Sequence, residues 1–218
     1  MLLSDFLPVW KELAPADRSF LENESMPRHV EKNCLVHDGS DQCEGLLCVV
    51  SGRLRAFISS DEGREITIYR LFERDICLFS AACILCGVQF AVSVEAEQDT
   101  DLLVIPSAAY KKVMEKSAPL ANYTNQIITS RFNDVVWLIE QILWKSFDRR
   151  LSSFLLEEST AEGSDHLKIT HEKIADHLGT AREVVTRMLR YFQSEGWVSL
   201  SRNCILLTDK EKLTSISS

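Results

Sequence analysis

The chain has 218 residues, of which 45% are hydrophobic and 26% are charged, and its formal net charge is −8 at pH 7. This length allows one large domain or two small ones with packed cores, and no apolar run approaches the roughly 20 residues that a membrane-spanning helix needs. We therefore expect a soluble globular protein without a membrane span, and the lack of a signal peptide pattern predicts a cytoplasmic location.

The charge is unevenly distributed along the chain. Residues 148–218 hold ten Lys and Arg against eleven Asp and Glu, so the upstream part carries −7 of the net −8. An acidic surface is compatible with nucleic-acid binding when basic side chains cluster where phosphates lie. Seven cysteines without a secretory signal favour reduced thiols over a disulfide framework.

The first two thirds of the chain change from helical to β pattern and back. Residues 5–25 contain two short helical patterns broken at Ala14–Pro15, and from Val30 to Pro106 short apolar runs alternate with turn residues. The predicted strands are Leu46–Val50, Arg53–Ile58, Glu65–Leu71, Phe90–Ala96 and Asp101–Ile105. We expect the first three to be consecutive antiparallel strands with tight turns, within a double-sheet barrel of the jelly-roll type.

One long helix is predicted after Pro119, because no Gly or Pro interrupts the 27 residues 120–146. Apolar residues recur in it at steps of four and three, the spacing of a coiled-coil seam: Ile128, Phe132, Val135, Ile139 and Ile142. We interpret this seam as a dimer interface, the alternative being a helix buried within a monomer. A second stripe of Val136, Leu143 and Phe147 could pack on the chain's own β domain or on the domain that follows.

The predicted fold class is α+β, in three parts. Residues 1–118 form a jelly-roll or cupin-like domain, residues 119–146 the dimerisation helix, and residues 147–218 a winged helix-turn-helix domain. The last boundary follows from Ser146–Arg149, which has the pattern of a helix end followed by a new N-cap.

The segment from Ile169 to Leu200 carries the most specific pattern. Thr170 is placed to cap a first helix, and Gly179 stands where two helices must turn sharply. The apolar residues expected to face inward are Ile174, Ala175 and Leu178 in the first helix and Val185, Met188, Leu189 and Phe192 in the second. This spacing predicts a helix-turn-helix, with a generic helical hairpin as the alternative.

The outward face of the second helix has the chemistry of a DNA recognition helix. Its polar residues are Arg182, Glu183, Thr186, Arg187 and Arg190. Arg can donate to guanine O6 and N7, Glu can accept from cytosine N4, and the Thr methyl group suits thymine. Strand patterns on both sides of Ser201–Asn203 predict a β-hairpin wing, with Arg202 at its tip near a phosphate.

These motifs, together with their order, resemble the Crp/Fnr family of bacterial transcription regulators from about Leu7 to Thr208. The most specific segments are GTAREVVTR in the helix-turn-helix and LLCVVSGRLR and EGREITIYRL in the β domain. The resemblance implies a cyclic-nucleotide-binding-like sensor domain, a homodimer on a palindromic operator, and contact with RNA polymerase as an activator. It also implies that Arg182, Glu183 and Arg187 contact the half-site, and the E-x-x-T-R arrangement resembles E-x-x-S-R of the Fnr branch. A TTGAT-like or TGTGA-like half-site is therefore our hypothesis.

The segment that would hold a cyclic nucleotide departs from the family pattern. Members that bind one carry a Gly-Glu pair and an Arg-Ser pair around the phosphate, whereas here Leu78–Ser80 and Gln89–Phe90 occupy those positions. The long helix has Val135 and Val136 where those members have hydroxyl groups. We therefore predict that cyclic AMP is not the effector.

The same segment is rich in cysteine. Cys83 and Cys86 form a C-x-x-C near Cys77, which suits a metal, an iron–sulfur cluster or a redox dithiol, but the neighbours are apolar and buried structural thiols are the plainer interpretation. A haem-bound gas or a small hydrophobic molecule are further alternatives, and no metal or cofactor is assigned. The effector-pocket candidates are Phe79, Ser80, Cys83, Cys86, Gln89, Phe90 and Val135.

Two other functional classes are alternatives to a DNA-binding regulator. A cupin-like metal-dependent enzyme would need clustered His and carboxylate ligands, and the predicted strands contain no H-x-H pair. A regulatory module whose helical hairpin binds protein instead of DNA is the second alternative. We predict a regulator without enzymatic activity.

Overall fold

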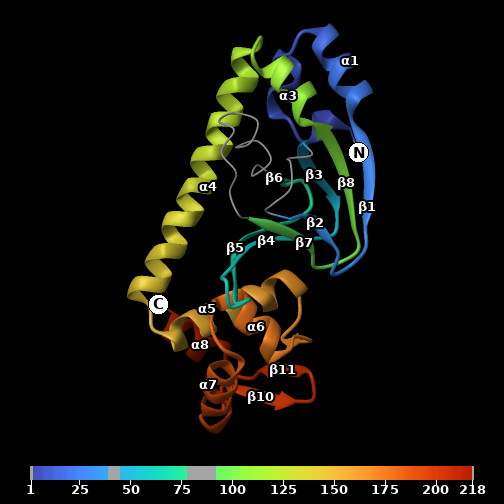
Figure 1. Ribbon diagram of the computed structural model, residues 1–218. Helices are drawn as coiled ribbons and strands as arrows, with labels where there is room; N and C mark the ends of the chain where they lie inside the picture. The colour runs from blue at the N-terminus through green and yellow to red at the C-terminus, as the bar shows by residue number, and fades with distance from the viewer. Residues whose placement is uncertain (1, 39–44, 78–91, 218) are drawn as a thin grey trace. The chain divides into compact units, whose positions relative to one another are not determined.

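A computed structural model describes residues 2–38, 45–77 and 92–217, and its helices and strands are labelled in Figure 1. The chain divides into two compact units. The first comprises Met1–Ile58 and Ile68–Val136, and the second comprises Ser59–Thr67 and Trp137–Ser218. Each unit has its own hydrophobic core, and each is described separately below.

The first unit begins with short helices that cover one end of its core. They are the 3₁₀ helices η1 (Leu3–Asp5) and η2 (Pro8–Glu12) and the helix α1 (Pro15–Glu24). Pro15 occupies the first turn of α1, where its missing N–H costs nothing, so the predicted break at Ala14–Pro15 is confirmed. Leu7 and Leu21 are fully buried in the same cluster as Tyr110 and Leu120.

Two four-stranded antiparallel sheets form the β part, as the jelly-roll prediction requires. One has the strand order β1-β8-β3-β6 and the other β2-β7-β4-β5. The strands are β1 (Met26–Val30), β2 (Leu35–His37), β3 (Gly45–Ser51), β4 (Leu54–Ser59), β5 (Glu65–Leu71), β6 (Ile76–Cys77), β7 (Ser93–Ala96) and β8 (Thr100–Pro106). Apolar residues of both sheets share one cluster, including Val49, Leu54, Val94 and Leu102, so the sheets pack face to face.

The prediction of three consecutive antiparallel strands is wrong in one respect. β4 and β5 are neighbours, but β3 lies in the other sheet, paired with β8 and β6. The chain crosses between the sheets at Gly52, whose φ is +91° and whose added Cβ would lie 2.5 Å from Oγ1 of Thr100. A tight turn sequence therefore marked a change of sheet and not a hairpin.

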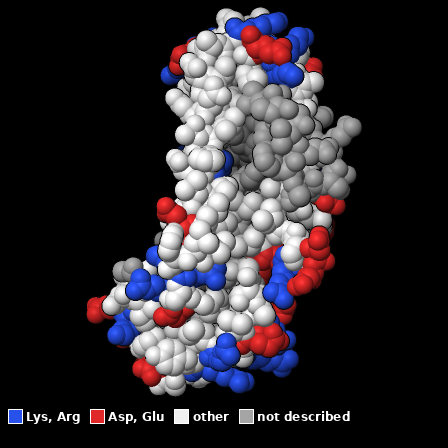
Figure 2. All heavy atoms as spheres, turned by 60° about the vertical axis from the view of Figure 1, so that its left-hand side comes forward, with Lys and Arg blue, Asp and Glu red and all other residues white. Residues whose placement is uncertain are grey.

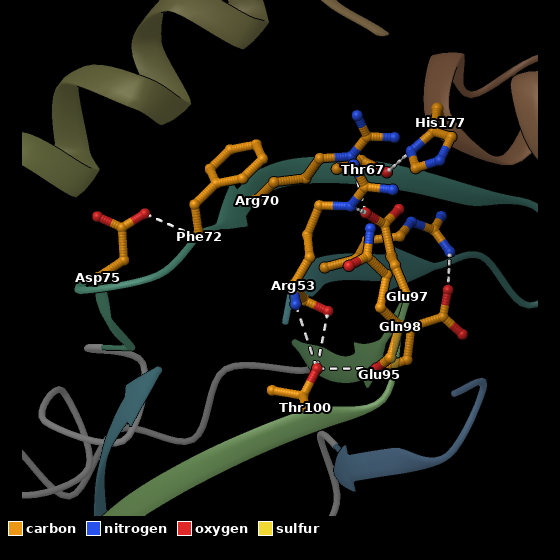
Figure 3. Close-up of polar contacts among 11 residues, drawn as sticks. Arg53, Thr67, Arg70, Phe72, Asp75, Glu95, Glu97, Gln98, Thr100 and His177 are labelled. Carbon is orange, nitrogen blue, oxygen red and sulfur yellow. Dashed lines mark hydrogen bonds and ion pairs between the residues drawn. The ribbon is translucent and has the colours of Figure 1, made fainter. Parts of the chain in front are cut away.

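A group of buried and half-buried charges lies on the β4 and β7 sheet (Figure 3). Arg55 is fully buried, its Nη1 lies 2.9 Å from Oε1 of Glu95, and its guanidinium lies over the Phe57 ring. Glu97 Oε2 lies 2.7 Å from Nε of Arg53. Because ionised groups are costly to bury alone, these pairs are what allow arginines inside the sheet.

Two helices follow the β part. α3 (Ser107–Met114) buries Tyr110 and Val113, and α4 (Ala118–Trp144) is a 27-residue helix that begins one residue before Pro119. Tyr110 Oη lies 2.7 Å from Oγ1 of Thr124, which joins α3 to the first turns of α4. The buried residues of α4 are Leu120 and Thr124, so the described helix beyond Thr124 has no fully covered side chain within one chain.

The second unit contains a three-stranded sheet and four helices. They are α5 (Phe147–Glu162), β9 (His166–Leu167), α6 (His171–Leu178), α7 (Arg182–Ser194), β10 (Val198–Ser201), β11 (Cys204–Leu207) and α8 (Lys210–Ser217). The sheet has the order β10-β11-β9. Its core unites Leu151 of α5, Ile174 of α6 and Phe192 of α7. The domain boundaries at 118/119 and 146/147 stay predictions.

Candidate DNA-binding site

The helix-turn-helix is built on two local signals that the sequence predicted. Oγ1 of Thr170 accepts a hydrogen bond from the backbone N–H of Lys173, at 3.2 Å, and so caps α6. α6 ends at Gly179, whose φ of +63° lies in the left-handed region. The chain therefore turns from α6 into α7 within three residues, and both predictions are confirmed.

α7 has two contrasting faces. Val185, Leu189 and Phe192 are 0% exposed and pack in the core of the second unit, while Met188 is partly buried against it. The packing leaves one side of the helix to solvent. The predicted inward stripe is confirmed.

The solvent face carries the predicted base-contacting residues. Arg182, Glu183, Arg187 and Arg190 are exposed, and Thr186 is half-buried. Helical spacing brings these five residues to one surface that starts at the first turn of α7. In Figure 2, Lys and Arg side chains lie among acidic ones on the part of the second unit that holds α7 and β10 in Figure 1.

The wing forms beside this surface. Ser201 pairs with Cys204 across the hairpin, Asn203 adopts a φ of +57° in the turn, and Arg202 at the tip is exposed. Asparagine tolerates this backbone conformation better than most residues.

A hollow of about 420 Å³ lies between the wing tip, the start of α6 and the start of α7. Its lining residues are Ile169, Thr170, His171, Glu172, Arg182, Ser201, Arg202, Asn203, Cys204 and Ile205. The structure thus brings Thr170, Arg182 and Arg202 around one depression. Glu183, Thr186, Arg187 and Arg190 do not line it and form the adjoining face of α7.

Two residues of the site were missed by the sequence reasoning. Nδ1 of His171 lies 2.9 Å from Oγ1 of Thr186, and Oε2 of Glu172 lies 3.9 Å from Nε of Arg182. Burial, together with the positive charges of Arg182 and Arg190, lowers the pKa of His171 below its ordinary value of 6.5. His171 belongs to no periodic pattern in the sequence that would indicate a functional role. The one signal available was its position directly after Thr170, the predicted cap of the helix.

Most effector-pocket candidates lie outside the described residues, namely Phe79, Ser80, Cys83, Cys86, Gln89 and Phe90. Val135 is half-buried on α4. Cys77 is buried, with Sγ 4.0 Å from Oη of Tyr69. Within residues 2–38, 45–77 and 92–217, no three His, Cys, Asp or Glu side chains gather as metal ligands would.

The first unit has a hollow of its own, of about 280 Å³, between the β5–β6 turn and α4. Its lining residues are Arg74, Asp75, Ile76, Tyr123, Gln126, Ile127, Ser130 and Arg131. Arg131 lies over the Tyr69 ring, 4.5 Å from its centroid, and its Nη1 is 3.0 Å from Oδ2 of Asp134. The sequence did not indicate a role for Arg131, because it lies in the predicted long helix and outside the segment that corresponds to the phosphate-binding part of the family pattern.

The charged residues around this hollow carry both signs, whereas a phosphodiester is an anion that binds to cationic donors. Here Asp134 contacts Arg131, and a second carboxylate, that of Asp75, shares the lining with Arg74. The hollow has mixed charge.

The capped helix pair, the apolar face of α7 and the hairpin wing define a winged helix-turn-helix protein. Residues 149–216 match the Crp-like helix-turn-helix domain, and residues 27–117 match the cyclic nucleotide-binding domain. No helix in the described parts of the chain is long and apolar enough to cross a membrane.

Comparison with known proteins gives the same result over nearly the whole chain. A crystal structure described as a transcriptional regulator of the Crp/Fnr family from Eubacterium rectale is 54% identical, with a TM-score of 0.95, over 98% of this chain and 99% of that one. The cyclic AMP receptor protein of Thermus thermophilus is 22% identical over 96% of each chain. The global nitrogen regulator of Synechococcus elongatus is 28% identical over 68% of this chain and 70% of its own.

The chain belongs to the Crp/Fnr family, and it is a DNA-binding transcription regulator and not an enzyme. The cupin-like enzyme and the protein-binding hairpin are thereby set aside.

Proposed function

We propose that the protein binds a palindromic operator as a homodimer and regulates transcription in response to an effector. The observation that carries this proposal is the two-faced α7: three core residues are fully buried, while Arg182, Glu183 and Arg187 are exposed on the other side. A helix placed in the major groove needs both properties, since one face must be held rigidly and the other must meet base edges.

The base contacts follow from side-chain chemistry. The guanidinium groups of Arg182 and Arg187 suit guanine, the carboxylate of Glu183 suits the amino group of cytosine, and Thr186 suits thymine. A half-site that combines G·C pairs with neighbouring T, as in TTGAT or TGTGA, supplies these partners. Two such half-sites would be separated by one turn of DNA, about 34 Å.

Phosphate contacts are assigned to the hollow beside the wing and to the edge of α7. Arg202 at the wing tip and the first turn of α6 after Thr170 would face the DNA backbone, with Arg190 on the outer part of α7. Contacts of this kind fix the position of the protein without specifying sequence.

The dimer is proposed to form along α4. Side-chain exposure changes the seam expected from the sequence. Phe132 (65% exposed) and Ile139 (49%) stay in it, and Val136 (38%) and Leu143 (66%) of the second stripe join it in place of the half-buried Val135, at a spacing of four, three and four. Figure 2 shows the face of α4 as a nearly uncharged band. Ile142 is also exposed, whereas Ile128 packs partly on the chain's own core.

The effector is proposed to act in the first unit and to be something other than cyclic AMP. The mixed charge of the hollow at Arg74 and Arg131 supports this proposal, as does the lack of an arginine at Gln89–Phe90 in the sequence. Redox chemistry at Cys77, Cys83 and Cys86, an iron–sulfur cluster, and haem remain open. A change in the packing of α4 would alter the geometry near Phe147, where α5 begins, and so the spacing of the two recognition helices. Contact with RNA polymerase follows from family membership as a proposal.

The decisive experiment is base selection followed by one substitution. The full-length protein selects its site from a library of random duplexes, and Arg187→Ala is then compared with wild type on the selected and scrambled duplexes. We expect the preference for the selected site to fall by about 10-fold or more per half-site. Arg64→Ala is the matched control, because Arg64 is an exposed arginine outside α7. An Arg187→Ala protein with an unchanged preference would contradict the proposed role.

Salt dependence tests the phosphate contacts separately. The affinity for either duplex should fall linearly with salt on logarithmic axes, at a slope of about 0.9 per neutralised phosphate. Arg202→Ala should make the slope shallower by about one per half-site and leave the preference for the selected sequence intact. An unchanged slope would exclude Arg202 from the phosphate contacts.

A further inference from the structure

Thr186 differs from other helical threonines of the chain in what its hydroxyl group contacts. Thr124, Thr129, Thr160 and Thr214 each donate a hydrogen bond to the backbone carbonyl four residues earlier, at 2.8 to 2.9 Å. Oγ1 of Thr186 instead lies 2.9 Å from a ring nitrogen in the neighbouring helix α6. A threonine in a helix occupies two χ1 rotamers, because its hydroxyl can donate a hydrogen bond to a backbone carbonyl three or four residues earlier. A hydrogen-bond partner in another helix therefore selects one of these rotamers.

The partner is Nδ1 of His171, the first residue of α6. Both side chains are half-buried, and Thr170 fixes the start of α6 by its capping bond. Burial and the nearby charges of Arg182 and Arg190 lower the pKa of His171, so the imidazole is neutral at pH 7. In either neutral tautomer, Nδ1 and the hydroxyl share one hydrogen bond, which fixes the direction of the hydroxyl and with it the side-chain rotamer of Thr186.

A threonine on a recognition helix can contact bases in two ways. Its hydroxyl can exchange hydrogen bonds with several base edges, which gives little selectivity, or its methyl group can pack on the C5 methyl of thymine. With the rotamer fixed by the contact with His171, the methyl group of Thr186 is held in one position, as a selective contact with the thymine methyl requires.

We propose that His171 is a positioning residue that turns Thr186 into a thymine-specific contact. This inference rests on the proposed DNA contact of α7. It assigns a role in base selectivity to a residue of the first helix of the motif, whose side chain need not touch a base itself.

The test uses the full-length protein and the operator obtained by selection from random duplexes. Each thymine of the half-site is replaced in turn by deoxyuridine, which lacks only the C5 methyl group. At one thymine position, which occurs once in each half-site, replacement by deoxyuridine should weaken wild-type binding roughly fourfold per half-site. This is the effect expected from the loss of one buried methyl group. His171→Phe, which keeps the ring and removes its nitrogens, should reduce this thymine-to-uracil ratio to near one.

Three further variants separate positioning from folding. His171→Asn keeps a polar atom near the place of Nδ1 and should restore most of the ratio. Thr186→Ser keeps the hydroxyl and loses the methyl group, so it should bind thymine and uracil sites equally. His166→Phe makes the same replacement at an exposed residue of β9 and should leave the ratio as in wild type.

The outcomes distinguish the inference from the function on which it rests. If no sequence is enriched from the library, the proposed operator binding fails, and the inference fails with it. If a site is enriched but wild type shows no thymine-to-uracil effect at any position, only the inference is overturned. The inference is also overturned if His171→Phe keeps the wild-type thymine-to-uracil ratio at the position where wild type shows the effect.

Discussion

Leu143→Ala tests whether α4 holds two copies of the chain together. About two thirds (66%) of the Leu143 side chain is exposed in a single chain, and full burial of a leucine is worth about 2 kcal/mol. Covering the exposed part would therefore contribute about 1.3 kcal/mol per copy. Because a symmetric dimer contains the residue twice, the substitution should cost about 2.5 kcal/mol, or roughly 70-fold in the dimer dissociation constant.

Sedimentation equilibrium over a dilution series measures this constant directly. Leu2→Ala is the matched control, since Leu2 is 67% exposed but belongs to the N-terminal segment and not to the exposed seam of α4. The control should leave the dissociation constant as in wild type. If both variants dissociate alike, the exposed seam of α4 is not the dimer interface.

Three further predictions concern stability, measured by urea denaturation. Burial raises the pKa of Tyr110 to about 12. The stability that the protonated Tyr110 gives to the folded state is therefore complete below pH 10 and lost as the pH rises toward 12. Tyr110→Phe should lower the free energy of unfolding by about 1 kcal/mol at pH 7 and should weaken the loss of stability at alkaline pH. Gly179→Ala should destabilise the protein more than Gly163→Ala does. At Gly163 an added Cβ meets nothing within 4 Å, so that variant has only the cost of a left-handed backbone, roughly 1 to 2 kcal/mol. At Gly179 an added Cβ would also lie 2.9 Å from the Ile66 side chain. Arg55→Met should cost about 3 kcal/mol, because it removes the buried positive charge that lies 2.9 Å from Glu95. Glu95→Gln in the same chain should recover much of the loss, and equal stability of the single and double variants would refute this.

Local signals were enough to predict the helix-turn-helix. Thr170 and Gly179 specify where α6 begins and ends through hydrogen bonding and backbone conformation, which depend on few neighbours. The inward stripe at Val185, Leu189 and Phe192 has the 3.6-residue period of an amphipathic helix. Such features can be predicted from a single sequence because each depends only on residues that are close together in the chain.

Features that depend on distant residues were harder to predict. The turn at Gly52 has the composition of a hairpin, but Thr100 and the pairing of β3 with β8 decide that the chain changes sheets there. The contact of His171 with Thr186 joins residues of two helices, and no spacing rule distinguishes it from a solvated histidine. Tertiary neighbours therefore determine both the sheet order and the detail of the candidate site.

α4 has two faces with different proposed roles, one in binding an effector and the other in dimerisation. Tyr123, Gln126 and Arg131 line the hollow of the first unit, while Phe132 and Ile139 are exposed in the single chain and belong to the proposed dimer seam. An effector that binds the hollow and shifts α4 would change the affinity of the dimer for DNA by some factor. Linkage requires that operator DNA change the affinity for the effector by the same factor. A screen should therefore detect a true effector at different concentrations with the selected operator and with a scrambled duplex: lower with the operator if the effector strengthens DNA binding, and higher if it weakens it. An effector that binds equally with both duplexes does not control DNA binding.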